Sequence, residues 1–400
     1  MGVKMKQIKQ GLAPKLRFRE FEKNGDWEET FLGNHCEITT GKLDANAMVE
    51  RGQYRFYTCA KDYYLIDKYA FDTDALLVSG NGANVGYIHH YKGKFNAYQR
   101  TYVLDRFEQD IFFIKYYLEK NLHKRISTEK KDGNTPYIVM STLTDMVVML
   151  PKDKKEQQKI ADCLSSLDEL IEAEDQKLEA LQHHKKGLMQ ELFPAEGQTI
   201  PKRRFPEFQS APEWEKKTLG EVGEIVTGKT PSTADESLWN GDIQFVTPTD
   251  IKEEKYQWKT QRSIVGNVGT KILPKHSTMF TCIASIGKMS LSIRPCITNQ
   301  QINSIIPNGN YKNEFVYYSL LNIAPLIKAT QSNTALPIIN KTDFSKFTLL
   351  TPITTVEQQK IADCLSSLDE LIEAQIKKLE SLRLHKKGLM QQLFPNHNQE

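Results

Sequence analysis

The chain has 400 residues, enough for two or three domains, and its hydrophobic fraction of 39% can build substantial cores. Lys and Arg number 53 against 50 Asp and Glu, so the net charge of +3 excludes bulk charge as the basis for binding a polyanion. Any nucleic-acid surface must therefore be local. The sequence has no run of eighteen apolar residues, which predicts a soluble cytoplasmic protein. The six cysteines include no CxxC pair, which argues against a metal site and a disulfide framework.

The first half of the chain divides into an N-terminal segment, residues 1–19, and a block of mixed secondary structure, residues 20–153. Short β-rich runs in this block predict strands at 54–57, 75–78, 100–104 and 147–150, and a helix is expected at 111–120. The segment HKRISTEKK, residues 123–131, is interpreted as a basic loop that approaches a phosphate backbone. The block is therefore expected to be an α+β domain.

A long helix is predicted for residues 154–193 by the spacing of its apolar residues. They follow a 4,3,4,3 rhythm, interrupted by the polar residues Glu174 and Lys185, and comprise Ile160, Leu164, Leu167, Ile171, Leu178, Leu181, Leu188 and Leu192. Five heptads give a rod about 55 Å long, and Pro194 ends it because proline cannot continue the hydrogen-bond ladder.

The second half repeats this organisation. After a linker, residues 194–212, a second block covers 213–354, a second helix 355–395 and a short tail 396–400. Residues 156–194 match 357–395 at an offset of 201 with seven differences, which indicates a duplication. The block entries match at an offset of 187, so the second block holds about fourteen extra residues, expected in loops around 252–271. Its strands are predicted at 243–246, 278–284, 302–306 and 347–350, with a helix at 314–324.

Two matching heptad seams predict that the repeated helices pack against each other as an antiparallel coiled coil with pseudo-twofold symmetry. The fold expected is α+β, with two globular domains separated by the paired helices. We expect facing residue numbers to sum to 560, which places Glu174 opposite Lys386 and Lys185 opposite Gln375. A register shifted by one heptad would leave Glu174 against Leu379, and an unpaired buried carboxylate is costly.

Two divergent blocks, each closed by EQQKIADCLSSLDELIEA followed by HKKGLMQ and LFP, resemble the specificity subunit of type I restriction-modification systems. The motifs ITTGK, EIVTGK, FVTPTDI and ITNQQ are also similar to that family, and the resemblance covers essentially the whole chain. It implies that each block is a target recognition domain for half of an asymmetric, split DNA site and that the helices set the spacing. It also implies a non-catalytic subunit that directs adenine N6 methylation or restriction. The implied partners are double-stranded DNA, methyltransferase subunits and restriction subunits, with S-adenosylmethionine, ATP and Mg in those subunits and no cofactor here.

Candidate DNA contacts come from polar positions that recur in both blocks. Arg and Lys suit guanine, whereas Asn and Gln suit adenine. The candidates are Lys42, Gln99, Arg100 and Asn134 in the first block, and Lys229, Gln300, Gln301 and Asn333 in the second. The alternatives are structural: the glutamines and Arg100 could tie a loop to the backbone, and the lysines could be solvated turn residues.

Candidate partner contacts are charges on the exposed faces of the helices, where the alternative is simple solvation of a coiled coil. They are Asp168, Glu172, Lys177 and Lys186, with their copies Asp369, Glu373, Lys378 and Lys387.

Two motifs are given structural interpretations. GNGANVG, residues 80–86, lacks the GxGxxG spacing, and only Gly86 has a glycine counterpart, Gly287, so a turn explains it better than a phosphate loop. NTPY, residues 134–137, resembles the NPPY of amino-methyltransferases but lacks its first proline and any cofactor motif, which favours an ordinary turn.

Two other functions stay open. The first is a coiled-coil interaction scaffold that does not bind DNA, which would show no salt-sensitive DNA binding. The second, a self-contained methyltransferase-nuclease, is weakened by the lack of catalytic motifs in the sequence.

Overall fold

The structure, a computed structural model, describes residues 13–129, 137–252, 254–266, 269–283, 285–331 and 338–395. The chain forms two compact units, each built from parts that are distant in sequence. The first unit is Met1–Asp175 with Lys378–Glu400, and the second unit is Gln176–Lys377. Each unit therefore holds one block, the beginning of one long helix and the end of the other. Within the described ranges, no helix is long and apolar enough to cross a membrane.

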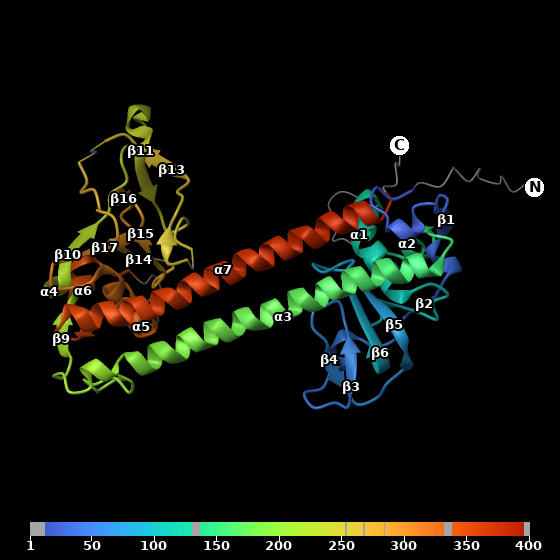
Figure 1. The fold of residues 1–400 in the computed structure, drawn as a ribbon, viewed down its shortest axis with the longest axis horizontal. Coiled ribbons are helices and arrows are strands. Elements are labelled where there is room, and N and C mark those ends of the chain that lie inside the picture. Colours follow the sequence, from blue (N-terminus) through green and yellow to red (C-terminus); the bar gives the residue numbers. More distant parts are fainter. Residues whose placement is uncertain are drawn as a thin grey trace, which may run out of the picture. The chain divides into compact units, whose positions relative to one another are not determined.

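The first unit is built on a six-stranded sheet with a helix on one face (Figure 1). Its strand order is β2 (Glu37–Thr40), β7 (Thr101–Asp105), β5 (Phe71–Ser79), β6 (Ile88–Ala97), β3 (Tyr54–Tyr57) and β4 (Tyr64–Ile66). All neighbours are antiparallel except β3 and β6. A separate pair joins β1 (Glu28–Phe31) to β8 (Val147–Leu150), and the helices of this block are α1 (Ile111–Glu129) and α2 (Met140–Thr144). Single turns of 3₁₀ helix lie at Arg19–Phe21, Leu32–Asn34 and Ala45–Ala47.

Strand alternation gives this sheet two apolar faces. Leu76 and Val78 of β5 pack with α1 in the main core, whereas Leu77 points to the opposite face. There it meets Tyr57 and Phe95 in a smaller aromatic core. Helix α1 continues to Glu129 because Leu122 and Ile126 extend its buried side. The prediction of a loop beginning at residue 123 is therefore wrong for residues 123–129, while residues 130 and 131 lie outside the described part of the chain.

The second unit has a related but more divided sheet system. Its five-stranded sheet has the order β10 (Gly223–Thr227), β17 (Ile302–Pro307), β14 (Thr278–Thr281), β15 (Met289–Ser292) and β12 (Tyr256–Gln257). A three-stranded sheet has the order β13 (Arg262–Ile264), β11 (Trp239–Val246) and β16 (Cys296–Thr298), and β18 (Thr348–Thr351) pairs with β9 (Glu215–Thr218). The block's helices are α4 (Leu219–Val222), α5 (Asn313–Gln331) and α6 (Lys341–Lys346), with 3₁₀ turns at Pro206–Phe208 and Glu236–Leu238. The segment around 252–271, where extra loop residues were expected, contains two short strands, β12 and β13.

The repeated helices are α3 (Lys154–Leu192) and α7 (Thr355–Leu393), and each begins on a buried carboxylate. In the first unit, Arg17 donates to both oxygens of Glu156, at 2.7 and 2.8 Å, and the indole of Trp27 donates at 3.2 Å. The second unit repeats this cluster with Arg204, Trp214 and Glu357 at the same three distances.

The helices also end in the same way in both units. Phe394, after α7, packs in the core of the first unit against Trp27 and Phe113, with ring centroids 6.3 and 5.2 Å away. Phe193, after α3, packs in the second unit against Trp214 and Phe315 at 6.0 and 5.9 Å. The LFP motif therefore anchors each helix in the core of the unit where it ends.

Within each unit the two helices pack together and antiparallel, which confirms the predicted fold class of two β-sheet domains with a packed pair of long helices (Figure 1). The predicted register is wrong. In the first unit Glu174 pairs with Lys378 at 2.6 Å and Asp168 with Lys386 at 2.5 Å, and in the second Lys185 pairs with Asp369 at 2.5 Å.

Facing residue numbers thus sum to about 554, close to one heptad from 560. The observed register is the one shifted by about one heptad, which the sequence disfavoured because Glu174 would lie against Leu379. Two features of the structure make it possible. Lys378, adjacent to Leu379, reaches Glu174, and carboxylates outside the apolar seam receive the two seam lysines.

Candidate nucleic-acid interface and helix junctions

In the first unit, two loops at one end of the sheet bring three candidate DNA contacts together. Lys42 follows β2 directly after Gly41, where a Cβ would lie 1.9 Å from the carbonyl oxygen of Ala97. Only glycine allows this close approach to the chain that leads into Gln99 and Arg100. All three candidate side chains are exposed. Arg100 and Gln99 also line a hollow of about 240 Å³ together with Gly80, Tyr102 and Ile138.

Gln99 partly fits the structural alternative. Its side-chain amide donates to Asp44 at 2.8 Å, and its backbone N–H donates to the carbonyl of Leu43 at 2.9 Å. This bonding ties the loop after β6 to the loop after β2. The side chain is consequently held in one place at the surface, which suits both a structural role and a reading role.

The second unit builds the same pair of loops with different side chains. Gly228 precedes Lys229, and a Cβ there would lie 2.1 Å from the carbonyl oxygen of Thr298. The next loop carries Gln300, whose Oε1 accepts a hydrogen bond from the Thr230 hydroxyl at 2.7 Å. The neighbouring Gln301 is half-buried, and its Oε1 accepts from the Asn299 side chain at 3.1 Å. Lys229, Gln300 and Gln301 thus lie together, as their counterparts do in the first unit.

The remaining two DNA candidates, Asn134 and Asn333, lie outside the described residues. The chain resumes after each of them with a single bridge residue, Tyr137 against Asn81 and Ile338 against Ile283. Gly86 and Gly287 have φ angles of +81° and +94°, so the interpretation of both as turn glycines is confirmed.

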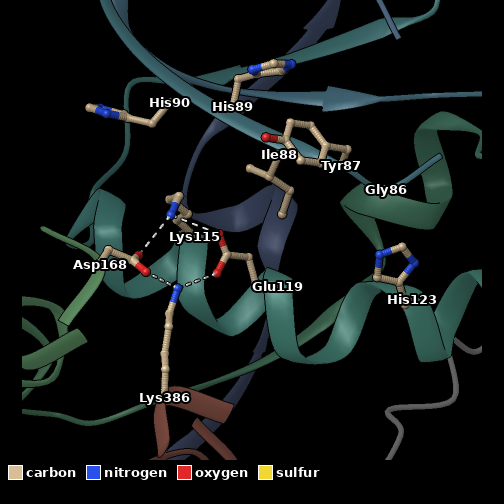
Figure 2. A pocket seen from close by; sticks show the side chains of 10 residues that line it. All are labelled: Gly86, Tyr87, Ile88, His89, His90, Lys115, Glu119, His123, Asp168 and Lys386. Atoms are coloured by element: carbon tan, nitrogen blue, oxygen red, sulfur yellow. Dashed lines mark ion pairs between the residues drawn. The ribbon is translucent and has the colours of Figure 1, made fainter. Parts of the chain in front are cut away.

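A polar junction joins the first block to both long helices. Asp168 of α3 accepts from the hydroxyl of Tyr116 at 2.8 Å and pairs with Lys386 of α7 at 2.5 Å. Lys115 and Glu119 of α1 complete an alternating set of charges, with Lys115 2.9 Å from Glu119 (Figure 2). This group borders a pocket of about 480 Å³ that also exposes the histidines 89, 90 and 123. Burial raises the pKa of Tyr116, which keeps its hydroxyl protonated well above neutral pH.

The second unit contains the same junction. Asp369 of α7 accepts from the hydroxyl of Tyr318 at 2.5 Å and pairs with Lys185 of α3 at 2.5 Å. Here the additional cation is Lys255, which precedes β12 and donates to Ser366 at 2.6 Å. Burial lowers the pKa of Lys255, and its ammonium lies 5.1 Å from the centroid of the Tyr318 ring. The two blocks thus place a second lysine at the junction from different parts of their sequences.

Some of the helix charges predicted to bind partner subunits instead make contacts within the chain. The expectation that Asp168 and Asp369 lie on a free face is wrong, because both bind a tyrosine and a lysine within their own unit. Lys378 and Glu373 also have ion-pair partners within the chain, at 2.6 Å in each case. The side chains of the other four candidates, Glu172, Lys177, Lys186 and Lys387, are exposed.

Comparison with known proteins identifies the class of this fold. The family described as "Type I restriction modification DNA specificity domain" matches residues 24–183 and 212–382. The EcoDI specificity subunit of Escherichia coli is 30% identical over 365 residues, covering 82% of this chain and 78% of that protein. The HindI specificity subunit of Haemophilus influenzae is 25% identical, covering 80% of this chain and 81% of that protein.

A solved specificity-subunit structure from M. genitalium matches with a TM-score of 0.66 and 20% identity, over 97% of this chain and all of that one. A second structure, described in work on assembly and conformational transition of a type I system, gives a TM-score of 0.57 at 15% identity. It covers 92% of this chain and 98% of that chain. The chain therefore belongs to the type I restriction-modification specificity subunits.

Sequence reasoning missed the tyrosines that complete the two junctions. Tyr116 and Tyr318 lie on helices from the divergent blocks, outside the near-identical repeat. The available signal was Lys185 and Lys386, two polar residues on an otherwise apolar seam. Such residues need a buried or half-buried acceptor, and a search for one would have led to Asp369 and Asp168.

Proposed function

We propose that each block of this specificity subunit is a target recognition domain that reads one half of an asymmetric, split DNA site. The observation that carries the proposal is the repeated pair of loops. Lys42 and Gln99–Arg100 in the first unit correspond to Lys229 and Gln300–Gln301 in the second, in loops that follow corresponding strands. The scaffold is the same, whereas the side chains available for base contacts differ.

The chemistry of these side chains suits the proposal. Arginine recognises guanine and glutamine recognises adenine by paired hydrogen bonds in the major groove, so unlike loops favour unlike half-sites. Lysines beside such loops supply phosphate contacts that position the protein without reading sequence. The target recognition domains would span residues 20–153 and 213–354, with Lys42 and Lys229 at the phosphate backbone.

We further propose that the paired helices keep the two half-sites at a fixed spacing and bind methyltransferase subunits. Each helix has 39 residues, about 58 Å at 1.5 Å per residue, which exceeds one turn of DNA, about 34 Å. The exposed charges Glu172, Lys177, Lys186 and Lys387, with Glu373 and Lys378, are the proposed docking residues. Asp168 and Asp369 would act indirectly, by holding the helices to the blocks.

In this proposal the subunit performs no chemistry itself. It directs adenine N6 methylation by methyltransferase subunits, which use S-adenosylmethionine. Restriction subunits that use ATP and Mg join the assembly on double-stranded DNA. The alternative function is a coiled-coil scaffold that does not bind DNA.

The test is to co-express the chain with a type I methyltransferase subunit from the same source and to map N6-methyladenine in the host DNA by single-molecule sequencing. We expect a split motif with a fixed gap. Substitution of Gln99 and Arg100 with alanine should relax one half of the motif, and substitution of Gln300 and Gln301 should relax the other. An assembled complex that binds cofactor but produces no motif would favour the scaffold.

A further inference from the structure

Arg55 of β3 has an environment that none of the proposed roles explains. Its guanidinium carbon lies 4.3 Å from the ring centroid of Tyr63 and 4.6 Å from that of Tyr91. One of its nitrogens donates to the hydroxyl of Tyr57 at 3.4 Å. Tyr57 is itself buried on the aromatic face of the sheet. The arginine is therefore held in position by three aromatic side chains.

This arrangement leaves most of the donors of Arg55 available. A guanidinium stacks with its flat face, and its N–H groups point outward along the rim. Among the described residues, no carboxylate lies within ion-pair distance of Arg55. In contrast, Arg17 and Arg204 are each paired with a buried glutamate. An ordered, half-buried cation with free rim donors is suited to an anion from outside the chain.

The position of Arg55 connects it to the loop that carries the candidate base contacts. The backbone N–H of Tyr98, next to Gln99, donates to the carbonyl of Tyr57 at 2.9 Å. The thiol of Cys59 lies 3.5 Å from the carbonyl oxygen of Arg100. The segment from Tyr57 to Tyr63 therefore connects the loop of Gln99 and Arg100, the reading loop, to the Tyr63 ring that contacts Arg55. Tyr63 is 46% exposed, so this site lies at the surface.

The second unit has an equivalent arginine on the equivalent hairpin. Strand β11 corresponds to β3, because β11 runs parallel to β16 as β3 runs parallel to β6. In this hairpin Arg262 of β13 lies over Trp239 of β11, with 3.3 Å from its guanidinium carbon to the ring centroid. Arg262 is exposed, and no ion pair of its side chain occurs within the described ranges. Both units thus hold an arginine of this hairpin against aromatic rings, although the two arginines are on different strands.

We infer that Arg55 and Arg262 each bind a phosphate of the DNA backbone beside the half-site that their own block reads. The inference rests on the proposed DNA-reading function and adds a positioning contact to it. A phosphate fits because it accepts two N–H donors from the rim of one guanidinium. A protein carboxylate would fit the same rim, but continuity with the reading loop favours DNA. Such contacts add affinity and fix orientation without reading sequence.

The experiment uses the complete complex with methyltransferase subunits and measures binding to a target duplex and an unrelated duplex over a salt series. Replacing Arg55 with alanine should weaken binding to both duplexes several-fold and by similar factors. The slope of log affinity against log salt should fall by about one, and by about two when Arg262 is replaced as well. The methylated motif should not change. Arg55→Gln, which removes the charge but keeps part of the aliphatic stem and a polar end, replaces the alanine variant if that variant does not fold.

Lys152→Ala is the matched control, because this exposed lysine of the first unit has a partner, Glu28, at 3.3 Å. Its salt slope should remain that of the parent complex. The inference is overturned if Arg55→Ala binds both duplexes like the parent complex, or if only target binding is lost. It is also overturned if the methyltransferase subunits no longer co-purify, since that result identifies a protein contact. If the unchanged complex shows no salt-dependent DNA binding, the proposed function itself fails and the inference fails with it.

Discussion

Lys386 of α7 places its ammonium 2.5 Å from Oδ1 of Asp168 on α3, on a helix seam that is otherwise largely apolar. The same carboxylate accepts the hydroxyl of Tyr116, so one aspartate joins both repeated helices to the first block. Lys185 and Asp369 repeat the relationship in the second unit. The two junctions therefore define the register of the helices within each unit.

The first prediction concerns this register. In a background with its native cysteines replaced by serine, Glu174→Cys with Lys378→Cys should be joined by a short thiol-reactive crosslinker, because the ends of the native side chains are in contact at 2.6 Å. Glu174→Cys with Lys386→Cys should not, since Lys386 lies against Asp168, nearly two turns away along the helix. Electrophoresis of the crosslinker-treated protein measures both. Crosslinking only between positions 174 and 386 would instead support the register expected from the sequence, in which facing residue numbers sum to 560.

The second prediction concerns the energy of the junction. Lys386→Met removes a largely buried cation and leaves Asp168 with Tyr116 and the more distant Lys115, at 3.9 Å. We expect a loss of about 1–2 kcal/mol in unfolding free energy, measured by urea denaturation. In a double-mutant cycle with Asp168→Asn, the coupling should be about 1 kcal/mol. Lys387→Met, at the exposed position next to Lys386, is the control and should change stability by less than about 0.5 kcal/mol.

The sequence predicted the long helices well because an apolar seam repeated every 3.5 residues depends only on local spacing. It failed on the register, because the partners of the seam lysines, Asp168 and Asp369, lie outside the seam. Strand β6 was missed because its residues IHHYKGKFNA do not form a β-rich apolar run, although its last three residues are buried. Its position in the sheet is decided by pairing with β5 and β3, which are distant in sequence.

The candidate reading loops could be identified from sequence because internal duplication aligns Gln99 with Gln300 and Lys42 with Lys229. The arrangement around Arg55 could not be identified in this way. Tyr63 and Tyr91 reach this arginine only after strands β3 and β6 pair. The corresponding arginine of the second unit, Arg262, is on a different strand, so no alignment of the two blocks relates them.

The third prediction concerns the buried carboxylate at the start of each helix. Glu156→Gln would leave the guanidinium of Arg17 without its anionic partner. The Arg17 side chain is only 10% exposed, so water cannot replace that partner well. Breaking a buried ion pair from one side costs about 3–5 kcal/mol. Thermal or urea unfolding should show this loss, and Glu357→Gln should show a similar one. Gln158→Ala is the control, because Gln158 is exposed and its side chain donates to Asp162 on the helix surface. Equal stabilities for Glu156→Gln and Gln158→Ala would contradict a stabilising role for the buried Arg17–Glu156 ion pair.

The fourth prediction concerns thiol reactivity. Burial raises the pKa of Cys36 and of Cys296 to about 12, and that of Cys282 to about 11. Because the thiolate is the reactive form, these three thiols should resist iodoacetamide at pH 8 in the folded protein. All three should react after denaturation, which serves as the control. Peptide mass spectrometry measures the labelling, and rapid labelling of Cys296 in folded protein would show that its surroundings are more open than the structure indicates.

The last prediction concerns the anchoring of α7. Phe394 is 1% exposed, and its ring contacts Trp27, Phe113 and Tyr117 at centroid distances of 6.3, 5.2 and 5.7 Å. Phe394→Ala should cost about 3–5 kcal/mol, because it removes a large buried side chain and leaves a cavity among rings that cannot fully collapse. Phe394→Leu keeps more of the volume and should cost less. The informative measurement is hydrogen exchange by region: the amides of residues 378–393 and of α1 should lose protection. Loss of protection confined to the last turn of α7 would instead mean that the helix end frays without the core, and that Phe394 does not hold the helix to the first unit.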